Sequence, residues 1–246
     1  NRGLWEKGYC DVRLPHRLST ALSSEENRYT NPFEFYRGDE VLYRQPAEYS
    51  AQRSSADRRI EKGRGELVDG ALLHRPKDFS RANFMSVRVL QDLLRAAVFP
   101  NSMPTERRFA LSAEDNRFLL HAMSMLPREC AHPRYDRSTY YDSHVKFFMF
   151  GDNKAPMPRH IRLFNKVGLA YGYLIDNAYI VDFERGVEFM LTAVIYANEN
   201  RIYNDGQYEY DEISFPFLAN LGRVLYEREV QREKEVIPDL SEFNLH

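Results

Sequence analysis

The chain has 246 residues, of which 43% are hydrophobic, so it can bury a core as one large domain or two small ones. Thirty-four Lys and Arg against 36 Asp and Glu give a net charge of -2, which excludes a broad electrostatic attraction to nucleic acid or to an anionic membrane. With 16 Tyr and 16 Phe the composition favours strands and packed interfaces over disorder, and no stretch approaches the roughly 20 apolar residues of a membrane span.

Residues 1–79 are predicted to be irregular, with an insertion. Turn signals such as RGDE and EKGRGELVDG surround short aromatic runs such as FEFY. The polar stretch SAQRSSADRR, residues 50–59, has no apolar period to bury, and we interpret it as the insertion. The glycines of GRGELVDG do not join a strand to a helix as a phosphate-binding loop requires, so we expect a turn there.

Residues 80–127 are predicted to be helical. Ser80 is the expected N-cap of a first helix that Pro100 stops. Ser112, with Asp115 three residues later, approximates a capping box for a second helix that ends at Pro127. Apolar residues recur at helical spacing in both, at Phe84, Val87, Leu90, Leu94 and Val98 in the first and at Phe118, Leu119 and Met123 in the second.

Residues 145–246 change to the period of a sheet. VKFFMFG fits either a strand or the end of a short apolar helix, whereas HIRLFNKVG, YGYLIDNAYIVDF and VEFMLTAVIYA are rich in β-branched and aromatic residues and predict three consecutive antiparallel strands. An amphipathic helix should follow and pack on the sheet through Phe217, Leu218, Leu221, Val224 and Leu225. The fold class expected is therefore α+β, an antiparallel sheet flanked by helices in a single domain.

One segment of these strands carries a motif. KVGLAYGYLIDNAYIV supplies Lys166, Gly168, Gly172, Asp176 and Ala178. This pattern resembles the third signature of class A β-lactamases and penicillin-binding serine hydrolases, which is Lys, Ser or Thr, and Gly at a strand edge, followed by a hairpin with Gly, Asp and Ala. The later strands and terminal helix come in the order that this family uses. The resemblance is clearest over residues 160–226 and weaker over residues 80–126.

The resemblance implies a β-lactamase or transpeptidase-like fold that lacks its amino-terminal segment, and a hydrolase that acts by acyl transfer. It implies a periplasmic or secreted protein of a bacterial branch of the family, with a small-molecule or peptide-like acyl substrate and no cofactor. By analogy Lys166 is a catalytic residue whose fixed positive charge attracts a substrate carboxylate. Val167, Gly168 and Leu169 then bind substrate, since Gly168 lets it approach the strand and the Leu169 amide donates to the oxyanion.

The nucleophile of this family is the serine of an S-x-x-K motif at a helix start. Only SHVK, from Ser143 to Lys146, fits that motif, and it lies close before Lys166 instead of far upstream. Val167 replaces the hydroxyl residue of the signature, no S-D-N triplet occurs, and YTN at residues 29–31 resembles the Y-x-N variant only as any short string does. We therefore expect that the nucleophile precedes Asn1 and that the 246 residues alone are hydrolytically inert.

Several alternatives stay open. Lys166 also fits a strand-edge lysine that discourages aggregation. Asp176 fits a structural hydrogen-bond acceptor as well as it fits a substrate contact. The main alternative function is a non-catalytic cell-envelope binding or scaffolding domain of the same fold.

Metal and disulfide chemistry are not expected. Cys10 and Cys130 are too few for a disulfide framework or a cysteine-based zinc site. The seven histidines form no H-x-x-x-H or H-E-x-x-H pair.

Overall fold

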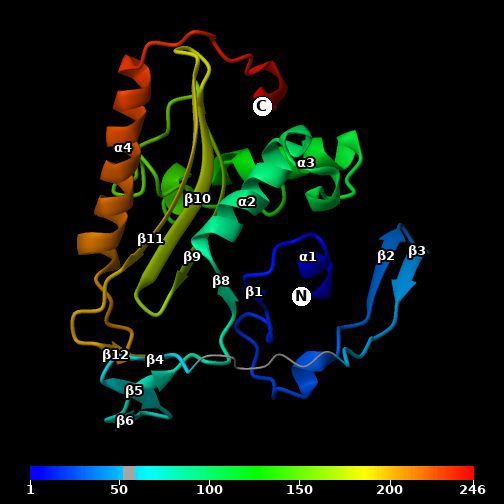
Figure 1. Cartoon of the computed structure of the whole chain (residues 1–246), viewed down its shortest axis with the longest axis vertical. Coiled ribbons are helices and arrows are strands. Elements are labelled where there is room, and N and C mark those ends of the chain that lie inside the picture. Colours follow the sequence, from blue (N-terminus) through cyan, green and yellow to red (C-terminus); the bar gives the residue numbers. More distant parts are fainter. Residues whose placement is uncertain (52–58) are drawn as a thin grey trace.

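The computed structural model describes residues 1–51 and 59–246. A three-stranded sheet of long strands forms the centre, with helices on both of its faces (Figure 1). Shorter strands from the amino-terminal third gather near one end of this sheet, and one hairpin stands apart from the rest of the chain (Figure 1). Most of the insertion predicted at residues 50–59, namely residues 52–58, lies outside the described residues.

The central sheet confirms the three predicted strands. Strands β9 (Ile161–Ala170), β10 (Tyr173–Asp182) and β11 (Val187–Tyr196) are antiparallel, and β10 lies in the middle. Tyr171 and Gly172 form the two-residue turn between β9 and β10, and both have positive φ, at 57° and 80°. Two positive φ values are what a type I′ hairpin turn needs, so Gly172 is required by the turn geometry itself.

Each face of the sheet packs against its own set of helices. Helices α2 (Val87–Val98) and α3 (Ala113–Ser124) cover one face, where Leu94, Val98 and Leu120 meet Phe164, Tyr179 and Val181. Helix α4 (Phe215–Gln231) covers the other face, where Leu218 and Tyr226 meet Leu163, Leu174 and Ile180. We refer to these as the α2 face and the α4 face. The predicted packing of the terminal helix on the sheet is confirmed.

The helix boundaries and stripes differ in part from the prediction. Helix α2 starts six residues later than predicted, with Ser86 as its N-cap, because residues 84–85 form strand β8 against β1 instead. Ser80 is not a cap; its hydroxyl accepts from the Ile60 amide. The Ser112 capping box of α3 is confirmed. Four residues predicted to be on buried stripes are exposed, namely Phe84, Val87, Phe118 and Val224, and so is Phe217.

The VKFFMFG segment forms neither a strand nor a regular helix end. A 3₁₀ turn, η5 (Asp142–Val145), leads into a buried tight turn around Phe147, Phe148 and Met149. This turn lies against α4 so closely that a Cβ on Gly222 would come within 2.6 Å of the Met149 amide nitrogen. Glycine is therefore needed in the middle of α4 for close packing.

The first 79 residues contain more structure than predicted. Their short elements are α1 (Arg2–Glu6), β1 (Val12–Arg13), β2 (Phe33–Arg37), β3 (Glu40–Gln45), β4 (Glu61–Lys62), β5 (Gly65–Val68), β6 (Ala71–Leu73) and β7 (Lys77–Asp78), and β8 (Phe84–Met85) follows them. Strands β2 and β3 form the hairpin that stands apart (Figure 1). Strand β5 pairs with β6 and, in parallel, with β12 (Ile202–Tyr203) from the carboxyl-terminal part. GRGELVDG thus includes a strand as well as a turn.

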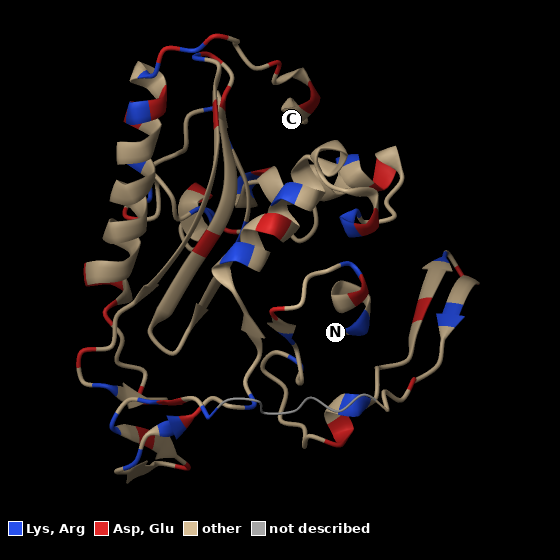
Figure 2. Ribbon diagram, viewed as in Figure 1, with Lys and Arg blue, Asp and Glu red and all other residues tan. Residues whose placement is uncertain are grey.

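The fold class is α+β, as predicted, with small antiparallel sheets and few helices. Within the described residues, no helix is both long and apolar enough to cross a membrane. Charged residues of both signs alternate along the outer elements, whereas the strands of the central sheet carry few (Figure 2).

Candidate active site

Lys166 lies on β9, an edge strand of the central sheet. It pairs with Asn177, whose amide donates to the Leu90 carbonyl of α2, and Asn177 in turn accepts from the Thr192 hydroxyl. Paired residues share a face, so Lys166, Asn177 and Thr192 form one polar row on the α2 face. The Lys166 side chain is exposed, and its Nζ donates to the Val167 carbonyl at 2.7 Å.

The sheet is open beyond this row, toward the β9–β10 turn. The next residues on the same face are Gly168, Ile175 and Val194, and Val194 is 41% exposed. A Cβ on Gly168 would come within 2.8 Å of the Ile175 side chain, so this position has room only for glycine unless Ile175 moves. Gly168 therefore leaves a flat, accessible surface beside the Lys166 ammonium.

The other two predicted substrate residues lie differently. Val167 is half-buried on the α4 face, where it packs against the core, so its side chain lies on the face opposite Lys166. Leu169 shares that face by alternation and is 51% exposed. The structure thus brings Lys166 and Gly168 together on one face and separates the Val167 side chain from them. The role of all four residues in catalysis stays a prediction.

The S-x-x-K match at Ser143 does not form a catalytic pair. Ser143 is 1% exposed, and its hydroxyl donates to the Asn153 carbonyl at 2.6 Å. The Lys146 ammonium donates elsewhere, to the carbonyls of Met123 and Leu163 and to Asn165 Oδ1. A serine nucleophile needs a base within hydrogen-bond reach, and the hydrogen bonds of Ser143 provide none.

Lys146 instead belongs to a buried polar network beneath β9. Its Nζ lies 2.6 to 3.0 Å from its three acceptors, and burial lowers its pKa to about 8. Asn165 links it to Asp176, because its amide donates to Asp176 Oδ1 at 2.8 Å. Asp176 also accepts from the amides of Phe147 and Phe148, and burial raises its pKa to about 6. These contacts favour the structural interpretation of Asp176 over a substrate contact.

A second polar cluster holds the carboxyl-terminal residues on α3. The Ser124 hydroxyl lies 2.8 Å from His246 Nε2, and His246 Nδ1 lies 3.7 Å from Glu129. The order Ser, His, Glu is that of a hydrolase triad. However, Ser124 is fully buried, and its hydroxyl already donates to carbonyls of its own helix. Burial lowers the pKa of His246, so the ring is neutral at neutral pH and the cluster acts as a tether.

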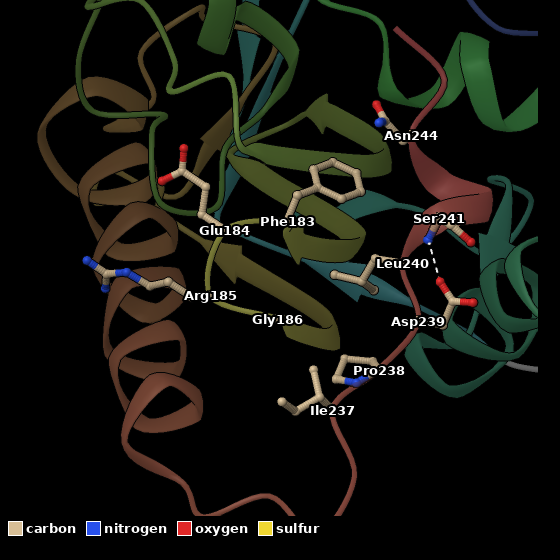
Figure 3. Close-up of a pocket in the computed structure, with 10 residues that line it drawn as sticks. All are labelled: Phe183, Glu184, Arg185, Gly186, Ile237, Pro238, Asp239, Leu240, Ser241 and Asn244. Carbon is tan, nitrogen blue, oxygen red and sulfur yellow. Dashed lines mark hydrogen bonds between the residues drawn. The ribbon is translucent and has the colours of Figure 1, made fainter.

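A hollow of about 400 Å³ lies at the opposite end of the strands from the β9–β10 turn. Its walls are the β10–β11 turn, residues 183–186, and the carboxyl-terminal segment, residues 237–241 with Asn244 (Figure 3). Phe183, Ile237 and Leu240 give it an apolar surface, while Glu184 and Arg185 extend away from the carboxyl-terminal segment (Figure 3). This hollow includes none of the predicted site residues.

Sequence reasoning missed both buried clusters. Lys146 stands in the apolar run VKFFMFG, and Asn165 interrupts an apolar strand, so both were visible as polar residues in buried surroundings. Ser124 and His246 are 122 residues apart, and nothing in the local sequence links them. Among the residues that the structure describes, no group of three or more His, Cys, Asp or Glu is arranged to hold a metal ion.

Comparison of the chain with models of known protein families, with curated proteins and with solved structures gave no match.

Proposed function

We propose that this chain forms the sheet wall of an acyl-transfer serine hydrolase similar to β-lactamases and penicillin-binding enzymes. The observation that supports the proposal is the position of Lys166 on edge strand β9, on an open part of the α2 face and next to Gly168. An ammonium there can attract a substrate carboxylate, and the flat backbone beside it can take an extended acyl chain. The substrate class proposed is a small-molecule or peptide-like acyl compound, met in the periplasm or outside the cell.

In this proposal the residues of the sheet bind and orient the substrate. Lys166 can exchange its hydrogen bond to the Val167 carbonyl for one to substrate, because its side chain is exposed and that bond is the only one its ammonium makes among the described residues. The polar row of Asn177 and Thr192 is already paired with itself and with α2, so it holds the strands in register and leaves the cation free. The nucleophile is a serine outside these 246 residues, since Ser143 and Ser124 are both buried and bonded.

A second candidate is a binding or scaffolding domain without catalysis. The hydrogen bond from Lys166 Nζ to Val167 O favours it, because a lysine that covers an edge carbonyl is a common protection against strand pairing. In that case Lys166 protects the edge of β9 and has no substrate.

The two candidates differ in their response to an acyl-serine probe. We expect the 246-residue chain to remain unlabelled, and stoichiometric labelling lost in Ser143→Ala would contradict the view that its nucleophile lies elsewhere. In a longer polypeptide with an upstream S-x-x-K, Lys166→Ala should lower acyl-transfer turnover by about 10²-fold, the scale for loss of a preorganised charge. Lys154→Ala, at another exposed lysine, is the control. Equal turnover in both variants would favour the scaffolding domain.

A further inference from the structure

Strand β11 is an edge strand with the composition of a central strand. Its sequence is VEFMLTAVIY, with one ionisable acid, Glu188, and no Lys, Arg or Pro. Phe189, Leu191, Ala193 and Ile195 pack toward the α4 face, and Met190 packs toward the α2 face. A strand that is apolar on both faces is typical of the interior of a sheet, where neighbours cover it on each side.

The outer side of β11 has no partner in the described part of the chain. β11 pairs along its whole length with β10, and none of the other hydrogen bonds among the described residues uses a backbone group of Val187–Tyr196. The side chains from Glu188 to Ala193 are half-buried although α2 and α4 both contact this strand. A ten-residue strand with a free row of amides and carbonyls is a template for another strand.

The opposite edge of the sheet is protected. On β9 the Leu163 carbonyl accepts from Lys146, and the Val167 carbonyl accepts from Lys166. Helix α3 also contacts β9. One edge of the sheet is therefore blocked by two lysines and a helix, whereas the other is left without either, which directs strand pairing to β11.

Helix α4 adds an apolar flank on the same side. Arg223 points from α4 toward the buried turn above the middle of the sheet, where it pairs with Asp152. Leu221 and Leu225 lie about 180° around the helix from the Arg223 side, by the 100° step per residue, and are half-buried. Val224 beside them is 66% exposed. This flank faces the outer side of β11, and Figure 1 shows α4 alongside that strand.

We propose that β11 pairs with β11 of a second copy of this chain, antiparallel, to form one continuous six-stranded sheet. A two-fold axis through the centre of the strand makes this edge complementary to itself. With all ten residues paired, Glu188 of one copy lies opposite Ile195 of the other, so no like charges face each other, and the net charge of -2 per chain adds little repulsion. Strand pairing alone buries little area, and the two α4 flanks meet beside it to bring the interface toward the roughly 1,200 Å² of a specific complex.

The first test is the oligomeric state of the purified chain. Light scattering over a concentration series should show a mass that rises from 29.0 kDa to twice that value. Hydrogen exchange at high and low concentration should show β11 amides protected only in the dimer, with β9 amides unchanged. A chain that stays at 29.0 kDa at a few hundred micromolar, or a dimer without added protection on β11, would overturn the proposal.

The second test places a lysine on the open edge. Val194→Lys should raise the dissociation constant by about tenfold or more, since a charge on an edge strand opposes pairing. Leu72→Lys on β6 is the matched control, because Leu72 has a similar exposure, 39% against 41% for Val194, and lies on another sheet. It should leave the constant within about twofold. If Val194→Lys folds and dimerises as the wild type does, the interface is not at β11.

Discussion

The buried network below β9 gives a sharp prediction about stability. Replacing Lys146 with methionine keeps the length and apolar stem of the side chain and removes the ammonium. The carbonyls of Met123 and Leu163 and Asn165 Oδ1 then lose their donor, and the Asp176 carboxylate loses its nearest positive partner. Lys166→Met is the matched control, because Lys166 also donates to an outer carbonyl of β9 but is exposed.

The magnitude follows from burial. Lys146 is 2% exposed, so water cannot replace the lost donor. Breaking a buried ionic network by removing one partner costs about 3–5 kcal/mol, and removing the desolvation cost of the ammonium offsets part of that. We expect Lys146→Met to lower the free energy of unfolding by about 3 kcal/mol. Lys166→Met should cost less than about 1 kcal/mol, the usual limit for an exposed polar contact.

Urea unfolding followed by circular dichroism measures both variants. The midpoint should fall for Lys146→Met with an unchanged slope, which reports lost stability without a change in the surface exposed on unfolding. Losses that agree within about 0.5 kcal/mol for the two variants would refute the reasoning, because they would mean that burial of Lys146 does not matter.

Two further predictions follow from features of the core. Because the pKa of Lys146 is about 8 in the folded chain and 10.5 in the unfolded chain, the unfolded chain binds more protons between these values. The free energy of unfolding of the wild type, measured relative to Lys146→Met, should therefore rise as the pH increases from about 8 to about 10.5, and a flat difference would contradict the shifted pKa. Gly222→Ala should lower stability by about 1–3 kcal/mol, since its Cβ would overlap the Met149 amide. Gly3→Ala, with open space around it in α1, should not destabilise the chain.

The parts of the fold that sequence predicted well are those with a strong local signal. The strands on either side of Gly172 were identified because β-branched and aromatic residues alternate around a turn residue, and α3 was identified because Ser112 and Asp115 form a cap from neighbouring positions. Ser80 failed as a cap because tertiary pairing of β8 with β1 overrides the local helix preference of residues 81–86.

The candidate site was predictable only as far as strand alternation reaches. That Lys166 and Gly168 share a face follows from their spacing, and the structure agrees. That Lys166 donates to the Val167 carbonyl and that Lys146 lies buried among three oxygens depend on contacts between distant segments. Phe118 was expected on a buried stripe, but α3 turns Leu120 and Ser124 to the core instead, which hydrophobicity alone does not decide.

The pairing of β5 with β12 sets an order of events during synthesis. Gly65 and Glu66 find their strand partners at Ile202 and Tyr203, and the Leu67 carbonyl accepts from Asn204, which is 137 residues later. The chain emerges from its amino terminus, so this parallel pair closes only after most of the polypeptide has been made. Contacts of such long sequence separation slow folding, because the loop between them must be closed first. The small amino-terminal strands are therefore expected to be among the last elements to form, after the β9–β10–β11 hairpins that lie closer together in the chain.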